Sequence, residues 1–132
     1  MAQSTEILPN GLQLLQDDRF FKLGQDSVLL SAFAKPRRNA KLLDLGCGTG
    51  ALALLVWRPD LKITGLELQD DPLDLFRQSI AANELGNVTA LQGDLRQMRT
   101  LLPHGSMDYV ICNPPYFDRN AGANAPTAEK RT

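Results

Sequence analysis

Lys41-Leu-Leu-Asp-Leu45 runs directly into Gly46-Cys-Gly-Thr-Gly50, and this junction decides the fold. The first segment is a short apolar run, which is typical of a strand buried on both faces. The glycines allow the backbone to approach a ligand closely, and residues 51–57 predict a helix that ends before Pro59. The spacing Gly-x-Gly-x-Gly differs from the dinucleotide pattern Gly-x-Gly-x-x-Gly, so the junction predicts a nucleotide-type cradle but not NAD.

Two further predicted strands each lead to an acidic residue. Residues 62–67 end in Glu67, whose carboxylate at the tip of a second parallel strand could accept both hydroxyls of a ribose. A solvated glutamate is the alternative. Residues 88–92 lead to Asp94, which could accept a hydrogen bond from the amine of an adenine or only cap the turn that begins at Leu95.

A fourth predicted strand, residues 107–112, is followed by Asn113-Pro-Pro-Tyr116. Ligands of open α/β sheets bind at the carboxyl ends of the strands. The two prolines remove backbone N–H donors, so this loop offers the Asn113 amide oxygen and proline carbonyls as acceptors beside the Tyr116 ring. This combination suits a planar amino group attached to a π system. The alternative is that the prolines simply end the strand.

In this order, the motifs over about residues 40–117 resemble the class I S-adenosylmethionine-dependent methyltransferases. The resemblance implies an α/β, Rossmann-like methyltransferase fold. Counted along the chain from residue 41, its four predicted strands would form a parallel sheet in the order 3-2-1-4, and the C-terminal strands of the family would be missing. It implies S-adenosyl-L-methionine as the cofactor, bound by Asp44, Gly46, Cys47, Gly48, Gly50, Glu67, Leu68, Asp94, Leu95 and Asn113. It also implies catalysis by Asn113, Pro114 and Tyr116, and substrate binding by Tyr116 and Phe117.

The segment before the glycine loop narrows this resemblance. Residues 11–24, followed by Gln25-Asp-Ser-Val-Leu-Leu-Ser-Ala-Phe-Ala34, resemble the opening of the tRNA adenine-N6 methyltransferases that modify valine tRNA. The implied function is methyl transfer to an exocyclic amino group, adenine N6 of tRNA. A glutamine N5-methyltransferase acting on a protein, a guanine-N2 RNA methyltransferase and a non-catalytic cofactor-binding module are the alternatives.

We expect residues 1–36 to form a strand pair and a capping helix, residues 37–117 the cofactor-binding core, and residues 118–132 a polar tail. The fourth strand would leave an open edge, which favours self-association.

Local signals place the expected N-terminal and connecting elements. The strand pair is predicted over residues 12–22, around Asp17-Asp18. Asp26 is predicted to cap a helix of about nine residues. Its apolar residues Leu29, Leu30 and Phe33 are expected to pack on the sheet. The helix after the second core strand is predicted from Asp71-Pro72 to Gly86.

Composition excludes some classes of function. The 132 residues carry a net charge of −1, which gives no global basic field and counts against an RNA substrate. Cys47 and Cys112 form no Cys-x-x-Cys pair, so we expect free thiols in a reducing cytoplasm and no metal site. His104 is not expected to be catalytic. There is no long apolar run and no secretory leader, so we expect a cytoplasmic protein outside the membrane.

Overall fold

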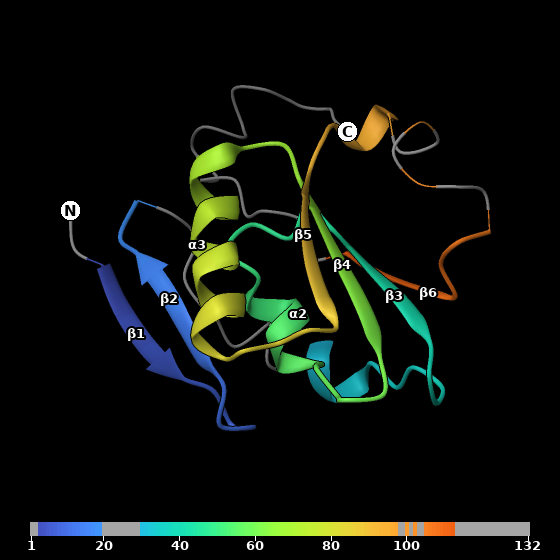
Figure 1. Cartoon of the computed structure of the whole chain (residues 1–132), viewed down its shortest axis with the longest axis horizontal. Coiled ribbons are helices and arrows are strands. Elements are labelled where there is room, and N and C mark those ends of the chain that lie inside the picture. Colours follow the sequence, from blue (N-terminus) through green and yellow to red (C-terminus); the bar gives the residue numbers. More distant parts are fainter. Residues whose placement is uncertain (1–2, 20–29, 98–99, 101, 103–104, 113–132) are drawn as a thin grey trace, which may run out of the picture.

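The computed structural model describes residues 3–19, 30–97, 100, 102 and 105–112. Its main element is a four-stranded parallel sheet in the order β5-β4-β3-β6 (Figure 1). The strands are β3 (Lys41–Leu45), β4 (Lys62–Glu67), β5 (Val88–Gln92) and β6 (Tyr109–Cys112). This order confirms the predicted 3-2-1-4 arrangement for the strands that the structure describes.

Successive side chains of β3 and β4 point to opposite faces of the sheet. Leu42 pairs in register with Ile63 and Tyr109, and these positions lie on the face that α2 (Ala51–Leu55) and α3 (Asp70–Ala82) cover. The same face holds most of the buried core, including Leu52, Leu73 and Phe76. The short 3₁₀ helix η1 (Leu95–Gln97) follows β5.

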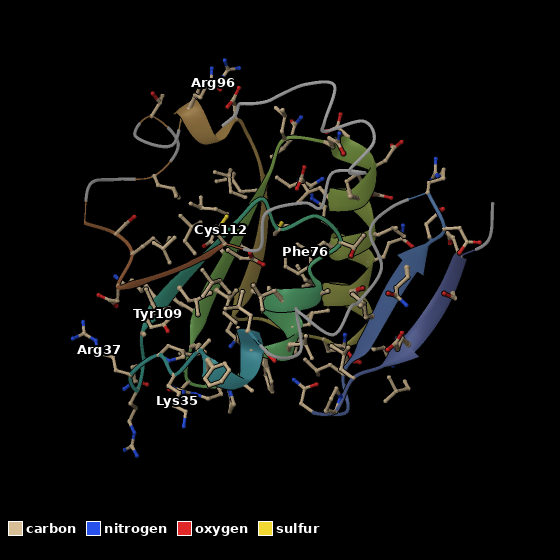
Figure 2. The ribbon with its side chains drawn as sticks, turned by 180° about the vertical axis from the view of Figure 1, so that it is seen from behind. Lys35, Arg37, Phe76, Arg96, Tyr109 and Cys112 are labelled. Atoms are coloured by element: carbon tan, nitrogen blue, oxygen red, sulfur yellow. The ribbon has the colours of Figure 1, made fainter. Side chains whose placement is uncertain are left out.

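The Phe76 side chain of α3, labelled in Figure 2, fits with its ring against two glycines, Gly50 and Gly65. It is completely buried. A Cβ atom at Gly65, in the middle of β4, would lie 2.5 Å from the ring, and one at Gly50 would overlap it. Gly50 also has a φ of +89°, a left-handed conformation that side chains disfavour. The absence of two side chains therefore lets α3 lie directly on β4 and on the end of the glycine loop.

The helix boundaries differ from the predicted ones at their C-terminal ends. Helix α2 ends at Leu55, and α3 ends at Ala82. The expected stop at Gly86 was wrong because Glu84 takes the left-handed conformation, with φ 54°, that turns the chain out of α3. The backbone N–H of Leu85 then bonds to the carbonyl of Ile80 at 3.1 Å, which closes the helix end.

The N-terminal strand pair lies earlier in the chain than predicted. It is an antiparallel hairpin of β1 (Gln3–Ile7) and β2 (Gln13–Asp17). The Leu8 N–H donates to the Leu12 carbonyl and the Gly11 N–H to the Leu8 carbonyl, both at 2.8 Å, which closes the connecting turn. Asp17 is not a turn residue. It is buried at the end of β2, where Arg19 binds both of its carboxylate oxygens at 3.0–3.1 Å. The turn signal is instead Pro9-Asn-Gly11.

The hairpin is attached to the side of α3 that faces away from the sheet (Figure 1). The Ser79 hydroxyl accepts from the Leu15 N–H at 2.9 Å, and the Asn83 amide bonds the N–H and the carbonyl of Gln13, both at 2.8 Å. Ser79 of α3 and Asn83, which caps the C-terminal end of that helix, therefore pair the free edge of β2, so that this edge is not left open.

Only part of the predicted capping helix lies among the described residues. Residues 30–33 are helical, and Asp26 and Leu29 fall outside the description. Leu30 and Ala34, four residues apart, pack against the core. The expectation that Phe33 packs on the sheet was wrong, since Phe33 faces away from this contact and is 78% exposed. The predicted tail, residues 118–132, also lies outside the described residues.

Gly50→Ala is expected to destabilise the protein, because the new methyl group overlaps the Phe76 ring and the backbone is left-handed. Together these effects are worth about 2–4 kcal/mol. Chemical denaturation of the variant measures the loss. Gly86→Ala is the matched control, because a Cβ atom there meets no other atom within 4 Å. Equal stability of the two variants would contradict the packing described for Phe76.

Candidate functional site

The glycine loop, residues 46–50, leaves the carboxyl end of β3 and is fixed by its own backbone. The Cys47 N–H donates to the Leu66 carbonyl of β4 at 3.0 Å, and the Gly50 N–H donates to the Cys47 carbonyl at 2.9 Å. Gly46 and Gly48 both have positive φ, and a Cβ atom at either would meet nothing within 4 Å. The loop therefore presents bare backbone to open space, as close approach of a ligand requires.

Glu67, at the end of β4, is bound to this loop. One carboxylate oxygen accepts from the Gly48 N–H at 2.8 Å, and the other accepts from the Gln69 N–H at 3.0 Å. A carboxylate has about four lone-pair positions, so each oxygen keeps one acceptor site for a ligand. The predicted ribose-binding acid therefore also positions the glycine loop, a role that the sequence motif alone did not indicate.

Asp44 lies beneath the loop at the end of β3 and is 1% exposed. Its Oδ2 atom is buried without a hydrogen-bond partner among the described residues. Burial raises the pKa of Asp44 to about 8, the backbone N–H of Ala53 in α2 opposes the rise, and the charge of Glu67 adds to it. A buried polar atom without a partner is uncommon in folded proteins and marks this position as a candidate ligand contact.

Asp94 follows β5 and is bound by Arg96. Its carboxylate accepts the Arg96 backbone N–H at 2.9 Å and the guanidinium at 2.6–3.2 Å. These bonds lower the pKa of Asp94 to about 2. Asp94 therefore caps η1, the structural alternative that the sequence left open, and its ionised form is held in one orientation. Sequence reasoning missed Arg96, for which the Asp-x-Arg spacing is the available signal.

The structure places some of the remaining predicted site residues, and the others lie outside the described part of the chain. Leu68 is 58% exposed next to Glu67, and Leu95 begins η1. Cys47 is buried, which raises the pKa of its thiol, whereas Cys112 is exposed at the end of β6. Both thiols are free. The residues that lie outside the described part of the chain are His104, Asn113, Pro114, Tyr116 and Phe117.

The described residues contain neither a metal-binding cluster nor a helix that could span a membrane. Among them, no group of three or more His, Cys, Asp or Glu side chains is arranged to hold a metal ion. No helix in the same part of the chain has the length and apolar character that crossing a membrane requires.

A parallel sheet with a Gly-x-Gly-x-Gly loop after its central strand and a carboxylate after the next strand defines an α/β domain of the nucleoside-cofactor-binding class. The sequence profile described as "Methyltransferase small domain" matches residues 24–129. The chain belongs to the methyltransferase small domain family.

Individual relatives and solved structures agree with this assignment. The chain is 35% identical over 105 residues to the tRNA1(Val) (adenine(37)-N6)-methyltransferase of Pseudoalteromonas translucida, covering 78% of this chain and 44% of that protein. It is 37% identical over 81 residues to the release factor glutamine methyltransferase of Aliivibrio fischeri, covering 60% of this chain and 28% of that protein. The chain thus spans less than half the length of these curated relatives.

Among solved structures, the tRNA (uracil-54, C5)-methyltransferase of Pyrococcus abyssi, in complex with S-adenosyl-L-homocysteine, superposes with a TM-score of 0.66. The superposition covers 86% of this chain and 28% of that one, at 16% sequence identity. At this identity the likeness establishes the fold, and it confirms the Rossmann-like methyltransferase architecture expected from the sequence.

Asp44→Asn is expected to change how stability depends on pH. The folded protein holds a proton on Asp44 up to pH about 8, whereas an ordinary aspartate releases it near 3.8. The wild type therefore loses stability as pH rises between these values, by up to about 1.4 kcal/mol per pH unit, and the asparagine variant lacks this loss.

Urea denaturation of both proteins at pH 5 and pH 7.5 measures the effect. Other titrating groups cancel in the difference between the two proteins. A difference that stays constant between the two pH values would show that Asp44 is ionised throughout.

Proposed function

We propose that this protein is an S-adenosylmethionine-dependent N-methyltransferase that acts on adenine N6 of tRNA. The observation that carries the proposal is the open glycine loop bound by Glu67, in a chain whose relative from P. translucida is named as such an enzyme. The test is to incubate the protein with unmodified tRNA and labelled cofactor, and to identify the methylated nucleoside by mass spectrometry. A substrate of this kind is found in the cytoplasm, where we infer that the protein acts.

The described residues fit S-adenosyl-L-methionine. Gly46 and Gly48 leave space over the backbone, Glu67 keeps acceptor positions for ribose hydroxyls, and Asp44 offers an unpaired oxygen. Asp94 is the further acceptor proposed for the adenine, and its ion pair with Arg96 keeps it charged. When bound, the cofactor supplies an electrophilic methyl group on a sulfonium.

The substrate amine is proposed to lie at Asn113 and Pro114, directly after the end of β6. The lone pair of an exocyclic amine is delocalised into its ring, so the amine is a poor nucleophile. Acceptance of its two N–H bonds by the Asn113 side chain and the Pro114 carbonyl would orient that lone pair. Tyr116, with Phe117, would stack on the base, which must leave its own stack. Orientation of this kind supplies up to ~7–11 kcal/mol of the barrier reduction.

A protein glutamine is the second candidate substrate, supported by the 37% identity to the A. fischeri release factor enzyme. A side-chain amide presents the same NH₂ geometry to the proposed acceptors. Parallel assays with tRNA and with a release factor separate the two functions. Methylation of guanine N2 would appear in the same nucleoside analysis, and a non-catalytic module would bind the cofactor without transferring its methyl group.

Glu67→Ala is expected to weaken binding of S-adenosylhomocysteine, measured by calorimetry. The variant loses acceptors for the ribose and also releases the Gly48 N–H. Each hydrogen bond to the charged group is worth ~1.5–3 kcal/mol. Glu67→Gln, which keeps one acceptor oxygen, should fall between the wild type and the alanine variant. Equal affinities for all three proteins would remove Glu67 from the ligand site.

Asn113→Ala is expected to abolish methyl transfer while leaving cofactor affinity nearly intact. Loss of the side-chain acceptor leaves the amine free to rotate its lone pair away from the methyl group. Removal of one oriented transition-state contact lowers rates ~10²–10³-fold. Single-turnover transfer, beside cofactor titration of the same variant, measures both properties. Transfer at the wild-type rate would refute the assignment, and a collapse of cofactor affinity would make Asn113 structural.

A further inference from the structure

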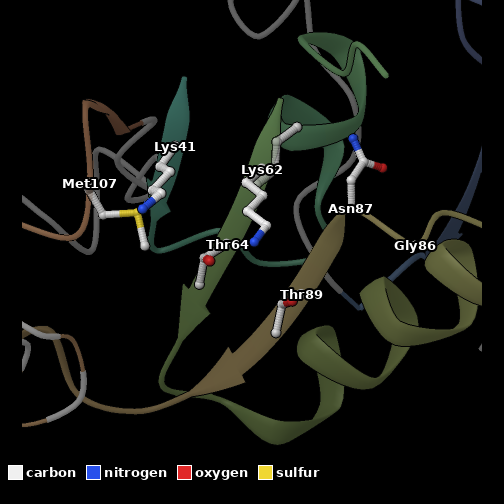
Figure 3. A pocket seen from close by; sticks show the side chains of 8 residues that line it. Lys41, Lys62, Thr64, Gly86, Asn87, Thr89 and Met107 are labelled. Atoms are coloured by element: carbon white, nitrogen blue, oxygen red, sulfur yellow. The ribbon is translucent and has the colours of Figure 1, made fainter. Parts of the chain in front are cut away.

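A pocket of about 220 Å³ opens on the sheet face opposite α2 and α3, near the edge where the strands begin (Figure 3). Lys41, Lys62, Thr64 and Thr89 bring their side chains to it from three adjacent strands, and Met107 lies beside Lys41. Thr64 pairs in register with Thr89, so the two hydroxyls lie side by side. The pocket therefore collects two ammonium groups and two hydroxyls.

The lysine and threonine side chains that line this pocket have no partner among the described residues. Within the described residues, the side chains of Lys41, Lys62, Thr64 and Thr89 form no hydrogen bond or ion pair. The nearby carboxylate of Asp108 is already bound by the Lys41 backbone N–H at 2.9 Å and by Arg37 at 3.1 Å. Lysine and threonine donors left free together suit an anion with several acceptor oxygens.

The surroundings of the pocket are also basic. Because the strands are parallel, the segments that enter them meet at one edge of the sheet. Lys35 and Arg37 lie at this end of the molecule, and Arg96 lies at the other (Figure 2). The charged residues of these entering segments are Lys35, Arg37, Arg38, Lys41, Arg58 and Lys62, against Asp60, Glu84 and Asp108. The pocket therefore sits in a local positive field although the chain has a net charge of −1.

We propose that this pocket binds a backbone phosphate of the RNA substrate, at a distance from the base that is methylated. The proposal rests on the tRNA function proposed above. Strands of five or six residues, at ~3.3 Å per residue, separate the two edges of the sheet by about 16–20 Å. Neighbouring nucleotides of an RNA helix stack a few ångströms apart, so a segment of several nucleotides spans this distance. One RNA stem can therefore contact the pocket while its base is at the carboxyl edge.

The test measures tRNA affinity and its salt dependence for Lys62→Gln and for Lys41→Gln/Lys62→Gln. Each lost phosphate contact should weaken binding roughly three- to tenfold and reduce the slope of log affinity against log salt by about one. Both lysines are exposed, so the fold should not change. Lys62→Arg should restore binding. Arg77→Gln is the charge-matched control, since Arg77 lies on α3 beside Asp74.

Cofactor affinity and methylation at saturating tRNA should match the wild type in the lysine variants, so that KM rises while kcat is unchanged. Unchanged tRNA affinity with normal methylation would overturn the phosphate site and leave the proposed function intact. A wild-type protein that neither binds nor methylates tRNA would overturn both proposals. Thermal stabilisation of the wild type by inorganic phosphate, with tRNA affinity insensitive to the lysines, would identify a small-anion site and overturn the RNA contact.

Discussion

Phe76 links the parts of the candidate site, because its ring fills the space that side chains at Gly50 and Gly65 would need. Gly65 lies in the middle of β4, and Gly50 ends the loop where α2 begins. Because α3 lies this close, the glycine loop can contact β4 directly. The Cys47 N–H donates to the Leu66 carbonyl, and the Gly48 N–H donates to the Glu67 carboxylate. Interiors are packed like crystals, so any displacement of the ring is transmitted directly to the loop.

Glu67 and Asp44, the two carboxylates near the glycine loop, differ in burial and in hydrogen bonding. Glu67 is half-buried and satisfied by two backbone N–H groups, whereas Asp44 is fully buried with one oxygen unpaired. Burial and the neighbouring charge of Glu67 both favour the protonated form of Asp44. A cationic ligand on the loop would favour the ionised form instead. Occupation of the proposed sulfonium site would therefore favour the charged form of Asp44 beneath the loop.

Local patterns were enough to predict the strands of the sheet and the glycine loop, because apolar runs and glycine spacing are read within a few residues, whereas the order of the strands came from the resemblance to the methyltransferase family. They failed where a distant contact decides the structure. Asp17 was predicted as a turn residue, but it is buried at the end of β2, a strand whose Leu15 and Gln13 are bound by Ser79 and Asn83, 64 and 70 positions away. The fit of Phe76 to Gly50, 26 positions earlier, follows only from the topology. The assignment of Asn113 stays a prediction.

The net charge did not predict how charged residues are distributed over the surface of this domain, because the order of the elements in space decides which of them meet. Parallel strands begin at one edge, so cations from residues 35–41 and 58–62 meet there although they are distant in sequence. Asp70 and Asp71 start α3 at the opposite edge, where acidic groups stabilise the positive end of the helix dipole. Although the net charge is −1, cations therefore gather at one edge of the sheet and these acidic residues lie at the other. Such a distribution orients an approaching polyanion even where the total charge does not attract it.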